Sequence, residues 1–168
     1  IIIDSKSGYS GAGRGVHKKY KDKNLYESLV PYGIASHRHN PEIEQTLKSY
    51  TKKKIEFNFT PHLLPMFRGI LSTIYLNLNK NVSYSQIIKT LSRHYKGSSF
   101  IKIFKKEKLL STNDVINTNN CYISVNKTKN KKKIIILCVI DNLIKGGAGQ
   151  AVQNLNLKFN YPLKNGLR

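Results

Sequence analysis

The chain has 168 residues and a formal net charge of +20, which is long enough for one domain with a hydrophobic core. Its apolar run from Ile134 to Ile140 is too short to cross a bilayer, so we expect a soluble, cytoplasmic protein with no membrane partner. Of the 29 basic residues 24 are Lys and five are Arg, and Arg is the residue that binds phosphates and base edges bidentately. The composition therefore argues against nucleic acid as a partner. The chain opens without an initiator Met or a signal peptide, and we expect it to be part of a longer protein.

After an opening strand, hydrophobic periodicity predicts two further strands in the first half of the chain. Apolar and polar residues alternate over 55–60, and the even-numbered positions of 70–78 form one apolar face. A helix is predicted over 83–95, because Ser83 and Gln86 form a capping box at its start.

The second half of the chain alternates between short strands and polar segments. Strands are predicted over 100–104 and 121–125, and the continuously apolar stretch 134–140 belongs in the interior of a sheet. A last helix is predicted over 143–157 from its apolar spacing. Turns and polar loops are expected at 112–120, 127–133 and 160–168. The fold class is α/β (α+β), a mixed β-sheet with flanking helices.

A glycine-rich loop, "SGYSGAGRG" from Ser7 to Gly15, follows the opening strand. Glycine at this density allows backbone N–H groups to approach an anion closely. Arg14 near its end adds a guanidinium suited to a carboxylate or a phosphate. A plain flexible loop is the alternative that this segment leaves open.

His37 and His39 are separated by one residue, so they share a face on an extended chain while Arg38 points the other way. A helix is predicted directly after them, with Asn40 as its cap and Pro41 in its first turn. Histidine suits acid–base chemistry near neutral pH, although a structural role remains open. A metal site would need a third ligand, and we predict no metal.

Between two predicted strands lies "FTPHLLPMFRGI", which we interpret as a loop stiffened by Pro61 and Pro65. His62 and Arg68 fall in this loop, and His62 is the only plausible third metal ligand for the histidine pair. Stiff loops at strand ends often carry functional groups. A surface crossover with incidental charges is the alternative.

The segment "DNLIKGGAGQAVQNLNL" leaves the predicted interior strand and enters a helix with a glycine-rich first turn. Glycine weakens that turn by propensity, so close approach of a ligand or of another backbone is expected there. A helix N-terminus favours phosphate or a cofactor. It is not a Walker loop, because Lys145 precedes the glycines and no Gly-Lys-Ser/Thr follows them.

Four segments in this order, "DSKSGYSGAGRG", "YGIASHRHNPEIEQ", "FTPHLLPMFRGI" and "DNLIKGGAGQAVQNLNL", carry a resemblance to one family. From Ile1 to about Tyr161 the chain resembles the N-acetyl-gamma-glutamyl-phosphate reductases of arginine biosynthesis. That family is related to aspartate-semialdehyde and glyceraldehyde-phosphate dehydrogenases. Its members join an N-terminal Rossmann domain, which binds NADPH, to a second domain that carries much of the substrate site and the subunit contacts.

The resemblance implies a glyceraldehyde-phosphate dehydrogenase-like C-terminal domain. Residues 1–140 would form the catalytic and dimerisation domain, 141–161 a helix that packs on the missing nucleotide-binding domain, and 162–168 a tail. The implied reaction is NADPH-dependent reduction of N-acetyl-glutamyl phosphate to the semialdehyde, through a cysteine thioester with histidine acid–base catalysis. NADPH would bind mostly through the missing domain, and the full-length enzyme would be a homo-oligomer, a dimer or a tetramer.

The resemblance also assigns site residues. His37 and His39 match the family's active-site "HRH" as the catalytic pair, and we slightly prefer His37 as the partner of the cysteine. The implied substrate-binding residues are Ser7, Arg14, Glu42 and Arg68. The residues expected at the nicotinamide end of the cofactor are Ser10, Gly11 and Asn142.

One departure from the family concerns the nucleophile, which lies in a "GCYPT"-type turn upstream of the glycine-rich loop. These 168 residues contain no such turn. Cys121 and Cys138 fall at strand positions after both motifs, without metal-ligand spacing, and are predicted to be buried, reduced thiols. We therefore expect an enzyme fragment that is inactive by itself. The alternatives are a basic nucleic-acid-binding module and a non-catalytic partner subunit.

Overall fold

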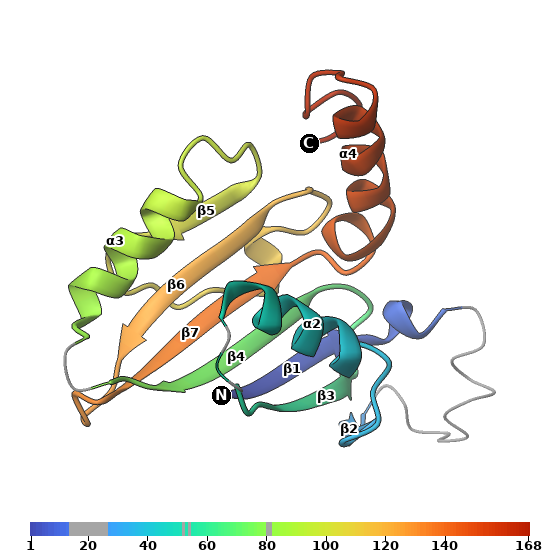
Figure 1. Ribbon diagram of the computed structural model, residues 1–168. Helices are drawn as coiled ribbons and strands as arrows, with labels where there is room; N and C mark the ends of the chain where they lie inside the picture. The colour runs from blue at the N-terminus through green and yellow to red at the C-terminus, as the bar shows by residue number, and fades with distance from the viewer. Residues whose placement is uncertain (14–26, 52, 54, 80–81) are drawn as a thin grey trace.

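The computed structural model describes residues 1–13, 27–51, 53, 55–79 and 82–168. Its centre is a seven-stranded mixed sheet in the order β2-β3-β1-β4-β7-β6-β5 (Figure 1). β1 runs parallel to β3 and β5 parallel to β6, and the other neighbouring strands are antiparallel. The strands are β1 (Ile2–Gly8), β2 (Val30–Pro31), β3 (Asn58–Leu64), β4 (Ile70–Asn77), β5 (Ile101–Phe104), β6 (Cys121–Lys127) and β7 (Lys133–Ile140).

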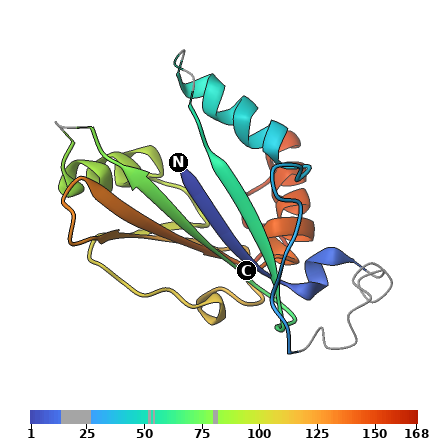
Figure 2. The same cartoon turned by 90° about the horizontal axis from the view of Figure 1, so that it is seen from below.

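In the described part of the chain, three α-helices accompany the sheet. In Figure 1, α2 lies across β1 and β4, α3 follows the edge formed by β5 and β6, and α4 stands beyond the end of β7. Figure 2 shows α2 and α4 together on one side of the sheet. No helix within the described residues is long and apolar enough to cross a membrane. The helices are α2 (Asn40–Tyr50), α3 (Tyr84–His94) and α4 (Gly149–Lys158).

The start of α3 confirms the predicted capping box. The Gln86 backbone N–H donates to Ser83 Oγ at 3.3 Å, and the Ser83 N–H donates to Gln86 Oε1 at 2.7 Å. The Tyr84 hydroxyl then donates to the Val125 carbonyl at 2.9 Å, which fixes the helix against β6. A local signal of four residues was therefore enough to place this helix.

β7 confirms the prediction of an interior strand, because it lies between β4 and β6. On one face Val139 packs against Leu110 and Val115 in a buried cluster. Val115 belongs to 112–120, which was predicted to be a polar loop. That prediction is wrong in part, since the segment forms a helical turn at Thr112–Asp114 and then buries Val115 completely.

β3 corrects the prediction of a stiff loop. Pro61 and His62 lie inside the strand, which begins at Asn58 rather than at 55. Proline cannot donate to a neighbouring strand, so it is tolerated only where few ladder bonds are needed. Here β3 borders the two-residue strand β2, and the Pro61 carbonyl accepts a hydrogen bond from the Tyr32 N–H at 3.0 Å. Arg68 does lie in the loop that follows.

The last predicted helix is divided at its glycines. Ile144–Ala148 forms a π-helical turn, in which the Gly146 N–H donates to the Asp141 carbonyl at 2.9 Å, and α4 begins only at Gly149. A Cβ on Gly149 would lie 2.6 Å from Asn119 Oδ1. The expected close approach is thus confirmed at Gly149, which packs against the chain itself.

The start of α2 differs by one residue from the prediction. Asn40 was predicted to be the cap, but it is the first helical residue, and His39 is the cap.

Candidate functional site

One group of predicted site residues meets at the end of the sheet where β1 and β7 end and β4 begins. Asn142 follows β7, and its side chain Nδ2 donates to Ser10 Oγ at 2.9 Å. The Asn142 Oδ1 accepts the Gly69 backbone N–H at 2.6 Å. This one amide therefore connects the segments that follow β1 and β7 with the start of β4.

Gly11 and Ser7 belong to the same group. A Cβ on Gly11 would lie 3.2 Å from Asn142 Nδ2 and 3.5 Å from Ser7 Oγ. Gly11 is exposed and has no side chain, so its backbone is accessible from solvent beside the buried Asn142 amide. The structure thus brings Asn142 together with Ser7, Ser10 and Gly11, more than 130 residues earlier in the chain. All four were predicted as site residues.

Beneath this group lies Asp141, whose carboxylate is completely buried. Its oxygens accept backbone N–H groups from Asn117 at 2.8 Å, Leu143 at 2.8 Å and Ile144 at 3.0 Å, and Arg68 Nη1 lies 3.4 Å away. A buried carboxylate is stable only when hydrogen bonds and an opposite charge compensate for its lost hydration. Asp141 meets both conditions, and it anchors the loop that follows β7. We call Asp141, Asn142 and Arg68 the anchor cluster.

Arg68 is held by two protein partners. Besides Asp141, its Nη1 donates to the Asn117 side-chain oxygen, and the Arg68 side chain is 24% exposed. Asn117 has a φ of 61°, a left-handed conformation that asparagine tolerates better than most residues. Sequence reasoning missed Asp141 and Asn117 as partners of Arg68. Asp141 was the more detectable of the two, because it directly precedes Asn142 at the end of an apolar strand.

The histidine pair forms a second group. The His37 ring contacts the rings of Tyr32, His39 and Phe59 edge to face, with centroids 5.4, 4.7 and 5.2 Å apart. The His39 backbone N–H donates to His37 Nδ1 at 3.2 Å. Because Nδ1 is an acceptor, the neutral His37 ring carries its hydrogen on Nε2.

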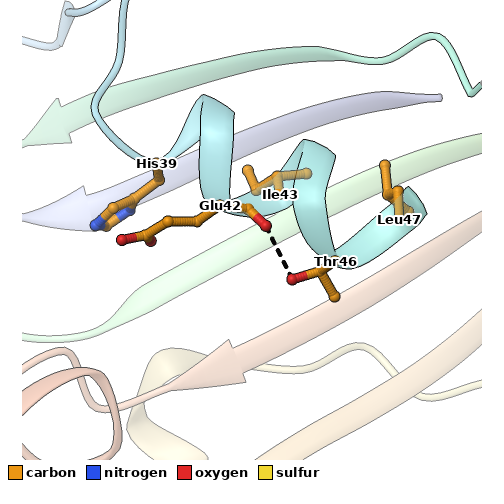
Figure 3. A pocket seen from close by; sticks show the side chains of 5 residues that line it. All are labelled: His39, Glu42, Ile43, Thr46 and Leu47. Atoms are coloured by element: carbon orange, nitrogen blue, oxygen red, sulfur yellow. Dashed lines mark hydrogen bonds between the residues drawn. The ribbon is translucent and has the colours of Figure 1, made fainter. Parts of the chain in front are cut away.

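His39 is exposed and lines an open hollow of about 360 Å³ along α2. Figure 3 shows its side chain and that of Glu42 extending side by side from the first turn of the helix. Ile43, Thr46 and Leu47 complete the lining, and Thr46 Oγ1 donates to the Glu42 carbonyl at 2.9 Å. The hollow is therefore polar at the start of α2 and mostly apolar farther along. We call His37, His39 and Glu42 the histidine cluster.

An apolar contact lies between the two clusters. Leu63 is buried, and Tyr9, Ala12 and Tyr32 pack against it. Tyr9 comes just before Ser10, while Tyr32 contacts the His37 ring edge to face. The anchor cluster and the histidine cluster thus lie on either side of one small hydrophobic contact.

His62 does not join the histidine pair. Side chains alternate along a strand, so His62 faces away from Phe59, on which the His37 ring packs. Its Nδ1 lies 3.2 Å from Asp4 Oδ1. In the part of the chain that the structure describes, no three His, Cys, Asp or Glu side chains form a metal-binding group. Arg14 lies outside the described residues.

The two cysteines are adjacent to each other but not to the histidines. Cys121 Sγ and Cys138 Sγ are 3.5 Å apart on β6 and β7. β7 is three strands away from β3, which carries the His37 contact, and neighbouring strands are about 4.8 Å apart, so about 14 Å separates them across the sheet. Both are free thiols, but they are half-buried rather than buried as predicted. Their adjacency depends on strand pairing and was missed.

Comparison with known proteins gives consistent matches. Residues 1–142 match the family described as semialdehyde dehydrogenase, dimerisation domain. The N-acetyl-gamma-glutamyl-phosphate reductase of Desulforamulus reducens is 45% identical over 162 residues, which cover 96% of this chain and 47% of that protein. The enzyme of the same name from Campylobacter jejuni subsp. doylei is 44% identical over 168 residues, 100% of this chain and 49% of that protein. The chain therefore spans about half the length of the curated relatives it matches.

A solved structure shares the fold. Aspartate semialdehyde dehydrogenase II from Vibrio cholerae superposes with a TM-score of 0.66 at 16% identity, covering 94% of this chain and 55% of that one. This confirms the predicted mixed sheet with flanking helices of the semialdehyde dehydrogenase type. The matches do not favour the alternative of a nucleic-acid-binding module. The chain belongs to the semialdehyde dehydrogenase family, through its dimerisation domain.

Proposed function

We propose that this chain is the substrate-side half of an N-acetyl-gamma-glutamyl-phosphate reductase, which reduces N-acetyl-glutamyl phosphate to the semialdehyde with NADPH in the cytoplasm. The observation that carries the proposal is the 44–45% identity to curated enzymes of that name across essentially the whole chain. The geometry supports it, because one apolar contact around Leu63 joins the segments that carry the histidine cluster and the anchor cluster.

His37 is the hydrogen-bond donor of the proposed site. Its Nδ1 accepts the His39 N–H, which orients the ring and leaves the hydrogen on Nε2. A donor of this kind stabilises a thiolate or the oxyanion of a tetrahedral intermediate. His39, exposed beside Glu42, is the group that exchanges protons with solvent.

The proposed substrate is an anion, and Arg68 is the guanidinium that we propose binds it. Asp141 and Asn117 engage one of its nitrogens, and a guanidinium has five N–H donors. Its remaining donors match a carboxylate or a phosphate. Ser7, Glu42 and Arg14 are the other proposed substrate contacts, with Glu42 suited to the acetylated amide rather than to the anionic groups.

The residues near Gly11 fit the nicotinamide end of NADPH. A carboxamide needs one hydrogen-bond donor and one acceptor, and no side chain may block its approach. Gly11 is exposed and has no side chain, and the Asn142 amide and the Ser10 hydroxyl lie beside it. NADPH supplies hydride when bound. Ser10, Gly11 and Asn142 would hold and orient its carboxamide, and the rest of the cofactor would bind outside this chain.

The nucleophilic thiol of the proposed reaction comes from sequence outside these 168 residues. Cys138 lies three strands, and Cys121 four strands, from the strand on which His37 packs. The chain as it stands is therefore expected to be inactive. α4 is the proposed contact with the nucleotide-binding half, since Val152 and Leu155 are 38% and 50% exposed on it.

The sheet face opposite α2 is the proposed subunit contact of the homo-oligomer. Ile2, Tyr75 and Ile135 lie in one row across β1, β4 and β7, and Ile2 and Tyr75 are 51% and 42% exposed. Segment 110–115 covers part of this face at Val139, and an exposed apolar row on the rest of it favours burial against another subunit. The matched family model, a dimerisation domain, supports this assignment.

A chimaera tests the proposed function. The N-terminal half of the Desulforamulus reducens reductase is joined to this chain, and NADPH oxidation is followed with N-acetyl-glutamyl phosphate. We expect turnover by the chimaera and none by this chain alone. A soluble, folded chimaera that binds NADPH but does not turn over this substrate would contradict the proposal.

A further inference from the structure

Cys121 and Cys138 occupy a position that the proposed reductase chemistry does not use. In the antiparallel ladder Cys121 pairs with Ile140 and Ile123 pairs with Cys138, so the two cysteines are diagonal neighbours on one face of the sheet. Their sulfur atoms are 3.5 Å apart, and each side chain keeps part of its surface exposed. An S–S bond is about 2 Å long, so a small side-chain rotation brings the sulfurs into bonding distance.

The surroundings of the pair make the two sulfurs unequal. A hydrogen bond from the Cys138 thiol and the positive charge of Lys145 hold the pKa of Cys121 below its usual value, against the opposing effect of burial. The same hydrogen bond, together with burial, raises the pKa of Cys138. Tyr95, at the end of α3, is the other titratable group facing the pair. These opposite shifts favour Cys121 over Cys138 as the attacking sulfur.

Lys145 is fixed next to this pair. Its Nζ donates to Gln153 Oε1 at 2.8 Å and lies 5.6 Å from the centroid of the Phe100 ring. Because burial lowers the pKa of Lys145, its ammonium is poorly hydrated, and a nearby thiolate compensates for that loss. The π-helical turn at Ile144–Ala148 thus presents a cation to the dithiol.

We propose that Cys121 and Cys138 are a redox-active dithiol, in which Cys121 attacks a low-molecular-weight disulfide and Cys138 resolves the product into an intramolecular disulfide. The Cys121 thiolate forms a bond to one sulfur of the small disulfide, whose S–S bond breaks and releases one thiolate. The Cys138 thiol then gives up its proton, and its sulfur attacks Cys121 and expels the second small thiolate. Two protein thiols are oxidised, and one small disulfide is reduced to two thiols.

The test uses glutathione disulfide as the oxidant and mass spectrometry of the chain as the readout. We expect a product lighter by two hydrogen atoms, with a peptide that links Cys121 to Cys138. In Cys138→Ser, one glutathione should remain attached to Cys121. In Cys121→Ser, Cys138 should stay unmodified over the same time. This readout does not depend on reductase activity. The dithiol proposal can therefore fail while the proposed reductase function holds, and the reductase function can fail while the dithiol proposal holds.

Three results would overturn the proposal. They are independent attachment of two glutathiones to the unaltered chain, faster modification of Cys138 than of Cys121, and a disulfide between two chains instead of within one.

The rate of Cys121 alkylation by iodoacetamide near neutral pH tests the role of Lys145. Lys145→Gln should slow it by about threefold, because removing a nearby cation raises the thiol pKa. Lys127→Gln is the matched control, since Lys127 lies at the opposite end of β6 and should leave the rate unchanged. Equal rates for both variants would remove Lys145 from the proposal.

Discussion

The anchor cluster and the histidine cluster lie on either side of one apolar contact and are held in opposite ways. Asp141 is completely buried and accepts three backbone N–H groups. His39 is exposed, and His37 is positioned by ring contacts and one hydrogen bond to its Nδ1. The anchor cluster is therefore part of the folding of the chain, whereas the histidine cluster lies at the start of α2, a helix without buried residues.

This difference separates stability from chemistry within one site. Removing a buried, fully bonded group leaves its hydrogen-bond partners buried without an acceptor and without water to replace it. The cost therefore appears in the free energy of unfolding. Removing an exposed ring leaves little unsatisfied, so its cost appears only in the reaction. The substitutions below test this separation in order of decreasing effect on stability.

Asp141→Ala should have the largest effect, a loss of about 3–5 kcal/mol in the free energy of unfolding, because it leaves a partly buried Arg68 and three N–H groups without their acceptor. Urea denaturation measures it. Asp114→Ala is the matched control, since Asp114 is exposed and accepts only the Ser111 N–H among the bonds found for it, and should cost about 1 kcal/mol. Equal losses for the two variants would contradict the anchoring role of Asp141.

Gly8→Ala should cost about 2 kcal/mol. Its Cβ would lie 2.6 Å from the Phe67 carbonyl oxygen and 2.8 Å from the Arg68 nitrogen, and both are backbone atoms that cannot move aside cheaply. The urea midpoint should fall without a change in the slope of the transition. An unchanged midpoint would show that the loop before Arg68 is not held tightly against β1.

Gly33→Ala is the corresponding change beside the histidines and should cost about 1 kcal/mol, because Gly33 has a φ of 59°. Its Cβ would lie 3.1 Å from His37 Cδ2, so we also expect the ring resonances of His37 to shift in the NMR spectrum. Ring resonances that stay in place would mean that Gly33 does not limit the position of His37.

His39→Gln should have the smallest effect on stability, within about 0.5 kcal/mol, since His39 is exposed on the surface of the chain. Urea denaturation of the variant and of the unaltered chain measures this difference in the free energy of unfolding. A loss above about 2 kcal/mol would show that the histidine cluster, too, is part of the folding of the chain.

Sequence reasoning succeeded where the signal is local. The capping box of Ser83 and Gln86 placed α3, and the unbroken apolar run placed β7 inside the sheet. Sequence reasoning failed at β3, where Pro61 lies inside the strand. A proline is tolerated there only because the neighbouring strand β2 is two residues long and needs few hydrogen bonds, and the length of β2 is not evident from the sequence.

The site shows the same limit. Ser10, Gly11 and Asn142 could be named because each lies in a motif that resembles a known family. The bonds from Asn117 and Arg68 to Asp141 could not, because they join three loops that only the strand order brings together. The adjacency of Cys121 and Cys138 likewise follows from the register of β6 on β7.

The most direct measurement is the kcat of the chimaeric reductase carrying His37→Gln, compared with His94→Gln, which changes an exposed histidine at the end of α3. We predict that His37→Gln lowers kcat by about 100-fold or more with the urea midpoint nearly unchanged, while His94→Gln retains full turnover. A His37→Gln chimaera whose kcat stays within about threefold of the unaltered chimaera would contradict the placement of the reductase site on the histidine cluster.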